Sequence, residues 1–151
     1  MFYNVNVMIV IKNKFIPFGS YTTINLFGIV FTKEEMTKKI INHERIHTIQ
    51  MLELALVVSI IVLTLIVFFD ISLWWVLIAC PTYYVWYIVE YMWISIMHNK
   101  QLCAYKDISF EEEAHANDDN LDYINNRKIF SWCKYLKSES NHKRSDKDCC
   151  N

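Results

Sequence analysis

The residues best suited to chemistry are His43, Glu44 and His47, which stand in the order H-E-x-x-H within the stretch Asn42 to Gln50. If this stretch is helical, the i, i+4 spacing places both imidazoles on one face, where two neutral ring nitrogens can bind one zinc ion. In such sites the glutamate does not bind the metal. It takes a proton from the metal-bound water and delivers it to the leaving amine. The motif therefore predicts a zinc hydrolase site with Glu44 as general base.

A hydrolytic zinc site takes three protein ligands and leaves the fourth position open for water. A glutamate on a later helix is one common source of the third ligand, and the segment Glu111–Ala114, which reads E-E-E-A, offers such a carboxylate. The same acids also suit the first turn of a helix capped by Ser109, because carboxylates there favour the helix dipole. The segment is therefore expected to be helical in either case.

The distribution of positive charge divides the chain. All fifteen Lys and Arg residues lie within residues 12–45 or 100–147, and the region between them contains two long apolar stretches. A helix needs roughly 20 apolar residues to cross a bilayer. The two stretches therefore predict membrane spans over residues 51–69 and 73–97. The alternative is a pair of buried helices in a soluble all-α core.

Basic residues flank both outer ends of this predicted hairpin, whereas the connection at residues 70–72 has none. By the positive-inside rule, both termini are expected in the cytoplasm and the short turn outside. Residues 1–17 lack the basic and apolar regions of a secretory signal. The sequence therefore predicts an integral membrane protein with two spans and the lipid bilayer as a partner.

The N-terminal segment has the composition of β-strands. Residues 3–11 are rich in β-branched side chains, and residues 21–31 are expected to form a second strand or two short strands hinged at Gly28. An edge strand here could hold an extended peptide by backbone pairing across the metal. After these strands, Thr32 or Thr37 could cap a helix that runs through the H-E-x-x-H motif into the first span.

The expected fold is mainly α with a small N-terminal β-sheet, a two-helix transmembrane hairpin, an active-site helix and C-terminal cytoplasmic helices. Residues 1–137 are predicted to form a single membrane-embedded domain and residues 138–151 a polar, disordered tail. Glu90 places a carboxylate inside the predicted second span. Intramembrane carboxylates are usually paired or functional. Glu90 is therefore expected either to form a structural hydrogen bond or to support a ligand histidine at the metal site.

The H-E-x-x-H helix followed by Glu111-x-x-Ala114 resembles the gluzincin arrangement of integral-membrane zinc metallopeptidases, including the prenyl-protein protease and antibiotic-sensing receptor families. This resemblance implies that Glu111 is the third zinc ligand. The fifth position of the pattern is His115, where these families often have Asp, so a metal role is open to His115. Glu113 is the alternative ligand.

The chain also resembles a set of short two-span, zincin-like bacterial membrane proteins. It shares with them, in order, IPFGS, INLFGIVF, INHExIHTxQ, a WYxxEY span and SFExEAxxN, over roughly residues 14 to 136. The resemblance implies a zincin-like protein of the bacterial inner membrane, and it does not identify a substrate.

Together these features predict a zinc metalloendopeptidase that hydrolyses a peptide or membrane-protein substrate at the cytoplasmic membrane surface, with Glu44 as general base. The alternative is a non-catalytic membrane protein with a structural or sensory zinc site, which the short length of the chain favours because little sequence is left to build substrate pockets. Nucleic acid is not an expected partner, because the basic residues are dispersed and no reading motif is present.

Overall fold

The computed structural model describes residues 2–5, 8–16, 22–98 and 101–136, and the predicted tail at 138–151 lies outside them. The chain divides into two compact units, Met1–Ile49 with Ala114–Lys128 and Gln50–Glu113 with Ile129–Asn151. The elements in chain order are β1 (Phe2–Val5), β2 (Met8–Lys12), β3 (Thr23–Leu26), β4 (Ile29–Thr32), α1 (Lys38–Phe69), η1 (Leu73–Ala79), α2 (Thr82–His98), α3 (Gln101–Lys106), α4 (Ser109–Asn117), α5 (Tyr123–Asn126) and η2 (Ser131–Lys134).

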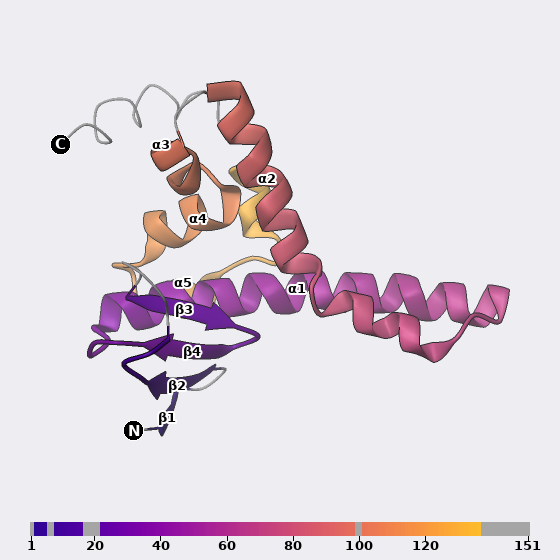
Figure 1. The fold of residues 1–151 in the computed structure, drawn as a ribbon, viewed down its shortest axis with the longest axis horizontal. Coiled ribbons are helices and arrows are strands. Elements are labelled where there is room, and N and C mark those ends of the chain that lie inside the picture. Colours follow the sequence, from indigo (N-terminus) through magenta and orange to yellow (C-terminus); the bar gives the residue numbers. More distant parts are fainter. Residues whose placement is uncertain (1, 6–7, 17–21, 99–100, 137–151) are drawn as a thin grey trace. The chain divides into compact units, whose positions relative to one another are not determined.

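The first unit contains a four-stranded sheet in the order β1-β2-β4-β3 (Figure 1). Strands β2 and β4 are parallel, whereas β1 and β3 form the antiparallel edges. Strands β3 and β4 are joined at Phe27 and Gly28, which have φ angles of 54° and 78°. Two successive positive φ angles are typical of the tight turns that close hairpins. The prediction of two short strands hinged at Gly28 is confirmed, and so is a mainly helical fold with a small N-terminal sheet.

One face of the sheet packs against the start of α1. Met8, Val10 and Val30 are buried on this face, and Met36 and Ile41 pack against them. Helix α1 begins at Lys38, where the Thr37 hydroxyl accepts a hydrogen bond from the Ile40 amide at 3.3 Å. Thr37 is therefore the residue that caps the helix, and the sheet is fixed against the turns that precede the H-E-x-x-H motif.

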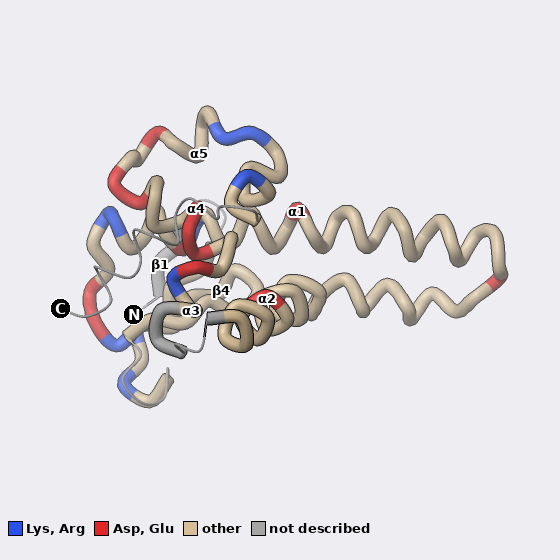
Figure 2. Tube along the Cα trace, turned by 90° about the horizontal axis from the view of Figure 1, so that it is seen from above, with Lys and Arg blue, Asp and Glu red and all other residues tan. Residues whose placement is uncertain are grey.

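The second unit contains the apolar part of α1. By length and composition, α1 is the one helix among the described residues that could cross a membrane, and no residue of its most apolar stretch is buried. A core helix of a soluble protein would bury such a stretch. Figure 2 shows this part of α1 free of Lys and Arg. The apolar side chains of α1 therefore suit a lipid environment.

The predicted two-helix transmembrane hairpin is wrong. Residues 73–97 do not form one helix, because the chain makes a 3-10 helix at Leu73–Ala79 and starts again as α2 at Thr82. Pro81 lies at the break. Proline has no N–H to continue a preceding helix, but it suits the first position of the next one. With a single candidate span, the predicted placement of both termini in the cytoplasm also loses its basis.

Aromatic side chains form the core of the second unit. Tyr83 stacks on Phe110 with ring centroids 4.7 Å apart, and Phe110 meets Trp132 edge to face at 4.8 Å. The Glu90 carboxylate accepts hydrogen bonds of 2.8 Å from both the backbone amide and the hydroxyl of Ser109. Since Ser109 is the first residue of α4, Glu90 fixes the start of that helix. Of the two roles expected for Glu90, these contacts correspond to the structural hydrogen bond.

Candidate metal centre

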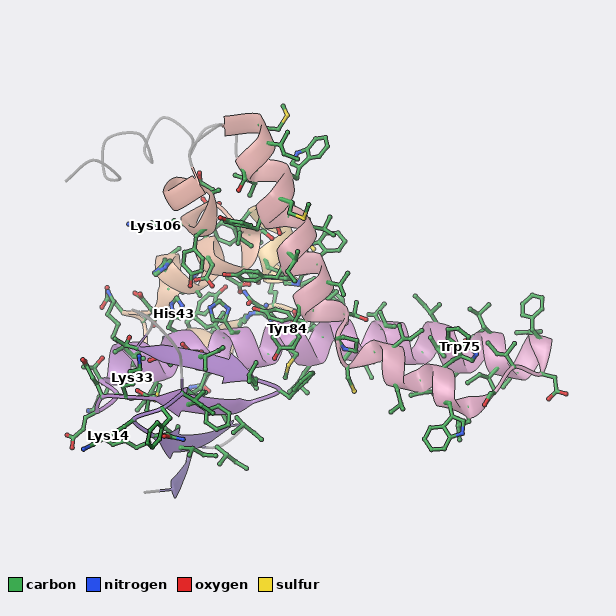
Figure 3. The ribbon with its side chains drawn as sticks, in the orientation of Figure 1. Lys14, Lys33, His43, Trp75, Tyr84 and Lys106 are labelled. Atoms are coloured by element: carbon green, nitrogen blue, oxygen red, sulfur yellow. The ribbon has the colours of Figure 1, made fainter. Side chains whose placement is uncertain are left out.

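The two histidines of the motif converge. His43, which is labelled in Figure 3, lies one helical turn before His47 on α1. The Nε2 atoms of the two residues are 3.0 Å apart and their rings are at 84°. Two nitrogens bound to one tetrahedral zinc at 2.0–2.1 Å lie about 3.3 Å apart. The observed spacing is therefore close to what a shared zinc ion requires.

Asp118 faces the opposite nitrogen of His43. Its Oδ2 atom lies 4.0 Å from His43 Nδ1, and its side chain is 7% exposed. Metal-binding histidines commonly direct their second ring nitrogen to a carboxylate, which fixes the tautomer and the orientation of the ring. At 4.0 Å this contact is longer than a hydrogen bond. The negative charge of Asp118 nevertheless favours the His43 tautomer with the proton on Nδ1, which leaves Nε2 available to a metal.

Lys39 balances the charge of Asp118. Its Nζ atom lies 3.1 Å from Asp118 Oδ1 and 2.7 Å from Asp119 Oδ2. The hydrogen bonds to Asp119 and Asp118 raise the pKa of the Lys39 ammonium, so it stays protonated at neutral pH. A cation bound directly by Asp118 would have to compete with this ammonium, which favours an orienting role for Asp118 over a ligand role.

His115 lies beside both His43 and Asp118. Its Nδ1 atom is 3.7 Å from Asp118 Oδ2, and its ring centroid is 4.6 Å from that of His43. The ligand atoms of His43, His115 and Asp118 all lie within 4.8 Å of one another, so these three side chains could also hold a metal ion. His43 is common to this group and to the H-E-x-x-H pair. The structure therefore offers two ways of completing a metal site around His43.

Replacing Asp118 by asparagine is expected to weaken zinc binding about 10- to 100-fold, the usual cost of losing a carboxylate that orients a ligand histidine. Zinc affinity of the purified protein can be measured by competition with a chromogenic chelator. Asp119→Asn is the matched control, because Asp119 also pairs with Lys39 but is 81% exposed. Equal loss in both variants would mean that the ion pair, and not contact with His43, controls affinity.

Asn42 holds the segment that carries Asp118. Its side-chain amide nitrogen lies 3.0, 3.2 and 3.0 Å from the carbonyl oxygens of Asn117, Asp118 and Asn120. Two amide hydrogens thus serve three acceptors. Asn42 is buried and immediately precedes His43 on α1. The residue before the motif therefore fixes the chain segment that supplies the carboxylate.

Asn42→Ala is expected to destabilise the protein by roughly 2 kcal/mol, because one buried and two partly buried backbone carbonyls lose their donor. The loss should appear as a lower unfolding temperature in detergent. Asn126→Ala is the control, since the Asn126 side chain makes one exposed bond of 3.3 Å to Asp122. If both substitutions shift the unfolding temperature equally, Asn42 does not have the anchoring role assigned to it.

The backbone of Glu44 contacts the edge strand β3. Glu44 is buried beside His43. The side-chain amide of Asn25, on β3, donates to the carbonyl oxygen of Glu44 at 3.0 Å and to Thr48 Oγ1 at 3.1 Å. These bonds hold the edge strand alongside the turn of α1 that contains the motif. The predicted juxtaposition of a strand edge with the H-E-x-x-H helix is thus present within the first unit.

The predicted carboxylate ligands belong to the second unit. Glu111 is buried on the first turn of α4 and accepts a hydrogen bond of 2.9 Å from the Tyr87 hydroxyl. Glu113 is also buried and accepts a bond of 2.9 Å from the Gln50 side chain. Glu111 and Glu113 as third ligands remain predictions. Each carboxylate has a donor that fixes one of its oxygens.

Sequence reasoning missed Asp118, Lys39, Asn42 and Asn25. Asn42 and Asp118 are 76 positions apart, and their contact runs from a side chain to a backbone carbonyl. No local spacing indicates such a contact. The sequence offered only weaker signals: an asparagine directly before H-E-x-x-H, and a pair of aspartates directly after a helix rich in possible ligands.

Comparison with protein-family models, curated proteins and solved structures finds no match for the chain.

Proposed function

We propose that the protein is a zinc-dependent membrane metallopeptidase of the gluzincin type, acting at the membrane surface. The observation that carries this proposal is the 3.0 Å approach of His43 Nε2 to His47 Nε2 on one turn of α1. Two imidazole nitrogens at this distance, with a carboxylate facing the far side of one ring, suit the binding of a single zinc ion. The unburied apolar stretch of α1 supports the membrane location.

In this proposal zinc is held by His43, His47 and the carboxylate of Glu111, with one position open. Bound there, it would polarise a scissile carbonyl and lower the pKa of a water molecule. Glu44 would accept the proton of that water and pass it to the leaving amine. Glu44 is buried and directly follows His43 on α1.

The outer edge of β3 suits an extended peptide. In antiparallel pairing with β4, β3 uses one edge of its backbone, and the other edge is the end of the sheet. A substrate adding to that edge would gain backbone hydrogen bonds with little dependence on its sequence. Asn25 fixes the strand to the helix turn of Glu44, so the peptide backbone would be held in register with the general base.

Metal removal tests the proposal directly. The purified full chain is expected to contain one zinc ion and to cleave a casein-type peptide in detergent. Removal of zinc with 1,10-phenanthroline should abolish cleavage, and added zinc should restore it. Bound zinc without any cleavage would favour the non-catalytic alternative. A chain that binds no zinc would exclude both functions.

A further inference from the structure

Helix α2 is apolar on the face that the protein leaves uncovered. Its inner face belongs to the aromatic core of the second unit, through Tyr83, Tyr84, Tyr87, Tyr91 and Ile94. Between Thr82 and Met97 every exposed position is also apolar: Val85, Trp86, Ile88, Val89, Met92, Trp93, Ile96 and Met97. A helix at the surface of a soluble protein carries polar side chains on its outer face. The outer face of α2 is therefore an interaction surface that suits an apolar environment.

The charge of α2 is directed to the protein. Glu90 is the one Asp, Glu, Lys or Arg between Thr82 and Met97. Its carboxylate accepts hydrogen bonds from Ser109 on α4 and a bond of 3.2 Å from the indole nitrogen of Trp86. The Thr82 hydroxyl donates to the carbonyl oxygen of Ile78 at 2.8 Å. The polar groups at both of these positions thus have protein partners.

The exposed apolar surface continues from α2 to α1 within the second unit. The connecting η1 exposes Leu73, Trp74, Trp75, Leu77 and Ile78. The start of α2 packs on α1, because the Tyr84 hydroxyl lies 3.8 Å from the sulfur of Met51, and Tyr83 belongs to the same core cluster as Met51 and Leu54. The apolar stretch of α1 begins at Met51. Helix α2 therefore starts at the level at which α1 would enter a bilayer.

Helix α2 does not run parallel to the apolar part of α1. Figure 1 shows the two helices steeply inclined to each other, and Figure 2 shows α2 almost end-on beside α1. If α1 crosses the bilayer, α2 runs along its surface. Helices in this position bury their apolar face about 5–10 Å into the boundary between lipid and water. Tryptophan is enriched at that boundary, and both Trp86 and Trp93 are exposed on α2.

We infer that α2 lies along the surface of the phospholipid bilayer that α1 crosses, with its outer face, Val85–Met97, in contact with lipid. The inference rests on the membrane location in the proposed function and is independent of zinc and of hydrolysis. Lipid fits better than a protein partner, because the apolar surface is continuous with that of α1. A protein interface would also have a polar rim, which the exposed positions of α2 do not provide.

The same helix holds the first turn of α4. Tyr87 donates to the carboxylate of Glu111 at 2.9 Å, and Glu90 accepts from the Ser109 amide at 2.8 Å. Lipid contact of α2 would therefore keep Glu111, the proposed third zinc ligand, close to the bilayer surface. The substrates that fit such a site are peptide segments that adjoin a membrane helix or are held at the lipid surface.

Depth-dependent fluorescence quenching tests this inference. The full chain, in phosphatidylethanolamine–phosphatidylglycerol vesicles, would carry the fluorescent amino acid acridonylalanine in place of Val85, Trp93 or Ile96 on α2, of Ile60 on α1, or of Lys106 on α3. The quenchers are phospholipids with a nitroxide either close to the headgroup or close to the end of an acyl chain. The shallow nitroxide is expected to quench the α2 positions equally, and several-fold more strongly than Lys106. Ile60, which is 57% exposed, should be quenched more strongly by the deep nitroxide.

Lys106 is the matched control because it is an exposed residue of the same unit and its side chain points away from α2 (Figure 3). Equal quenching at Lys106 and Trp93 would overturn the inference. A helix that crossed the bilayer would set Val85 and Ile96 about 16 Å apart in depth. A change from shallow to deep quenching between these two positions would therefore also overturn it.

The α1 position separates failure of this inference from failure of the proposed membrane location. Quenching at Ile60 without quenching at any α2 position would refute the inference alone. Absence of quenching at Ile60 as well would exclude α1 from the bilayer, and both proposals would fall. Circular dichroism of each labelled protein would check that the fold is retained. Because the acridone replaces an indole at Trp93, that variant is the one least disturbed by the label.

Discussion

Glu44→Gln is expected to lower the rate of peptide hydrolysis by about 10²- to 10⁴-fold, the range associated with loss of a general base. Glutamine has nearly the size of glutamate but cannot accept the proton of the attacking water. Zinc affinity should stay within a few-fold of the wild-type value, because Glu44 is not a proposed ligand. Rates of peptide cleavage and zinc content, measured on the same preparation, check both parts.

The control for this experiment is Glu35→Gln, which changes a carboxylate with a side chain that is 93% exposed and that pairs with Lys12 at 3.5 Å. It should leave hydrolysis unchanged. Retention of full activity by Glu44→Gln would exclude the proposed mechanism, whether or not zinc is bound. Loss of zinc together with activity would indicate that Glu44 supports the metal or the fold instead of moving a proton.

His47→Ala is expected to weaken zinc binding by more than about 100-fold, beyond the effect of removing a residue that merely orients a ligand. His47 can join a metal with His43 through Nε2, whereas the other possible group contains His43, His115 and Asp118. The two groups can therefore be separated by one substitution in each. Zinc per chain, measured by mass spectrometry after dialysis, reports which group is used.

His115→Ala is the matched comparison and should retain zinc, because His115 belongs only to the second group and is 47% exposed. The reverse pattern, with zinc lost from His115→Ala and kept by His47→Ala, would place the metal at His43, His115 and Asp118 and would refute a hydrolytic H-E-x-x-H site. His43→Ala should abolish binding in either case, so it verifies the assay.

The features predicted correctly from the sequence are those set by local spacing. The i, i+4 histidines meet because a helix returns to the same face every four residues. The hairpin at Gly28 could be predicted because glycine readily adopts the positive φ angle, 78° here, that the turn requires. The helical character of Ser109–Asn117 was also indicated locally by its acidic first turn, although the Ser109 hydroxyl donates to Glu90 instead of capping the helix. In each case the residues that determine the structure are near neighbours in the chain.

The features that were missed or wrong depend on distant contacts or on a single backbone constraint. Residues 73–97 have the composition of a span, but Pro81 divides them into two helices of different kinds. The apolar composition of a segment does not show the effect of the single backbone N–H that Pro81 lacks. Asp118 could not be matched to His43, because the segment that carries it is held by an amide on another helix. Such a contact has no periodicity that a single sequence can reveal.

The bonds from Asn42 to three carbonyl oxygens and the pairing of Lys39 with Asp118 involve no metal ion. These contacts join protein groups to one another, so each contributes to the free energy of unfolding in its own right, unlike the ligands of a zinc finger, where the ion supplies the folding energy. Part of the stability around His43 is therefore expected to be independent of metal binding.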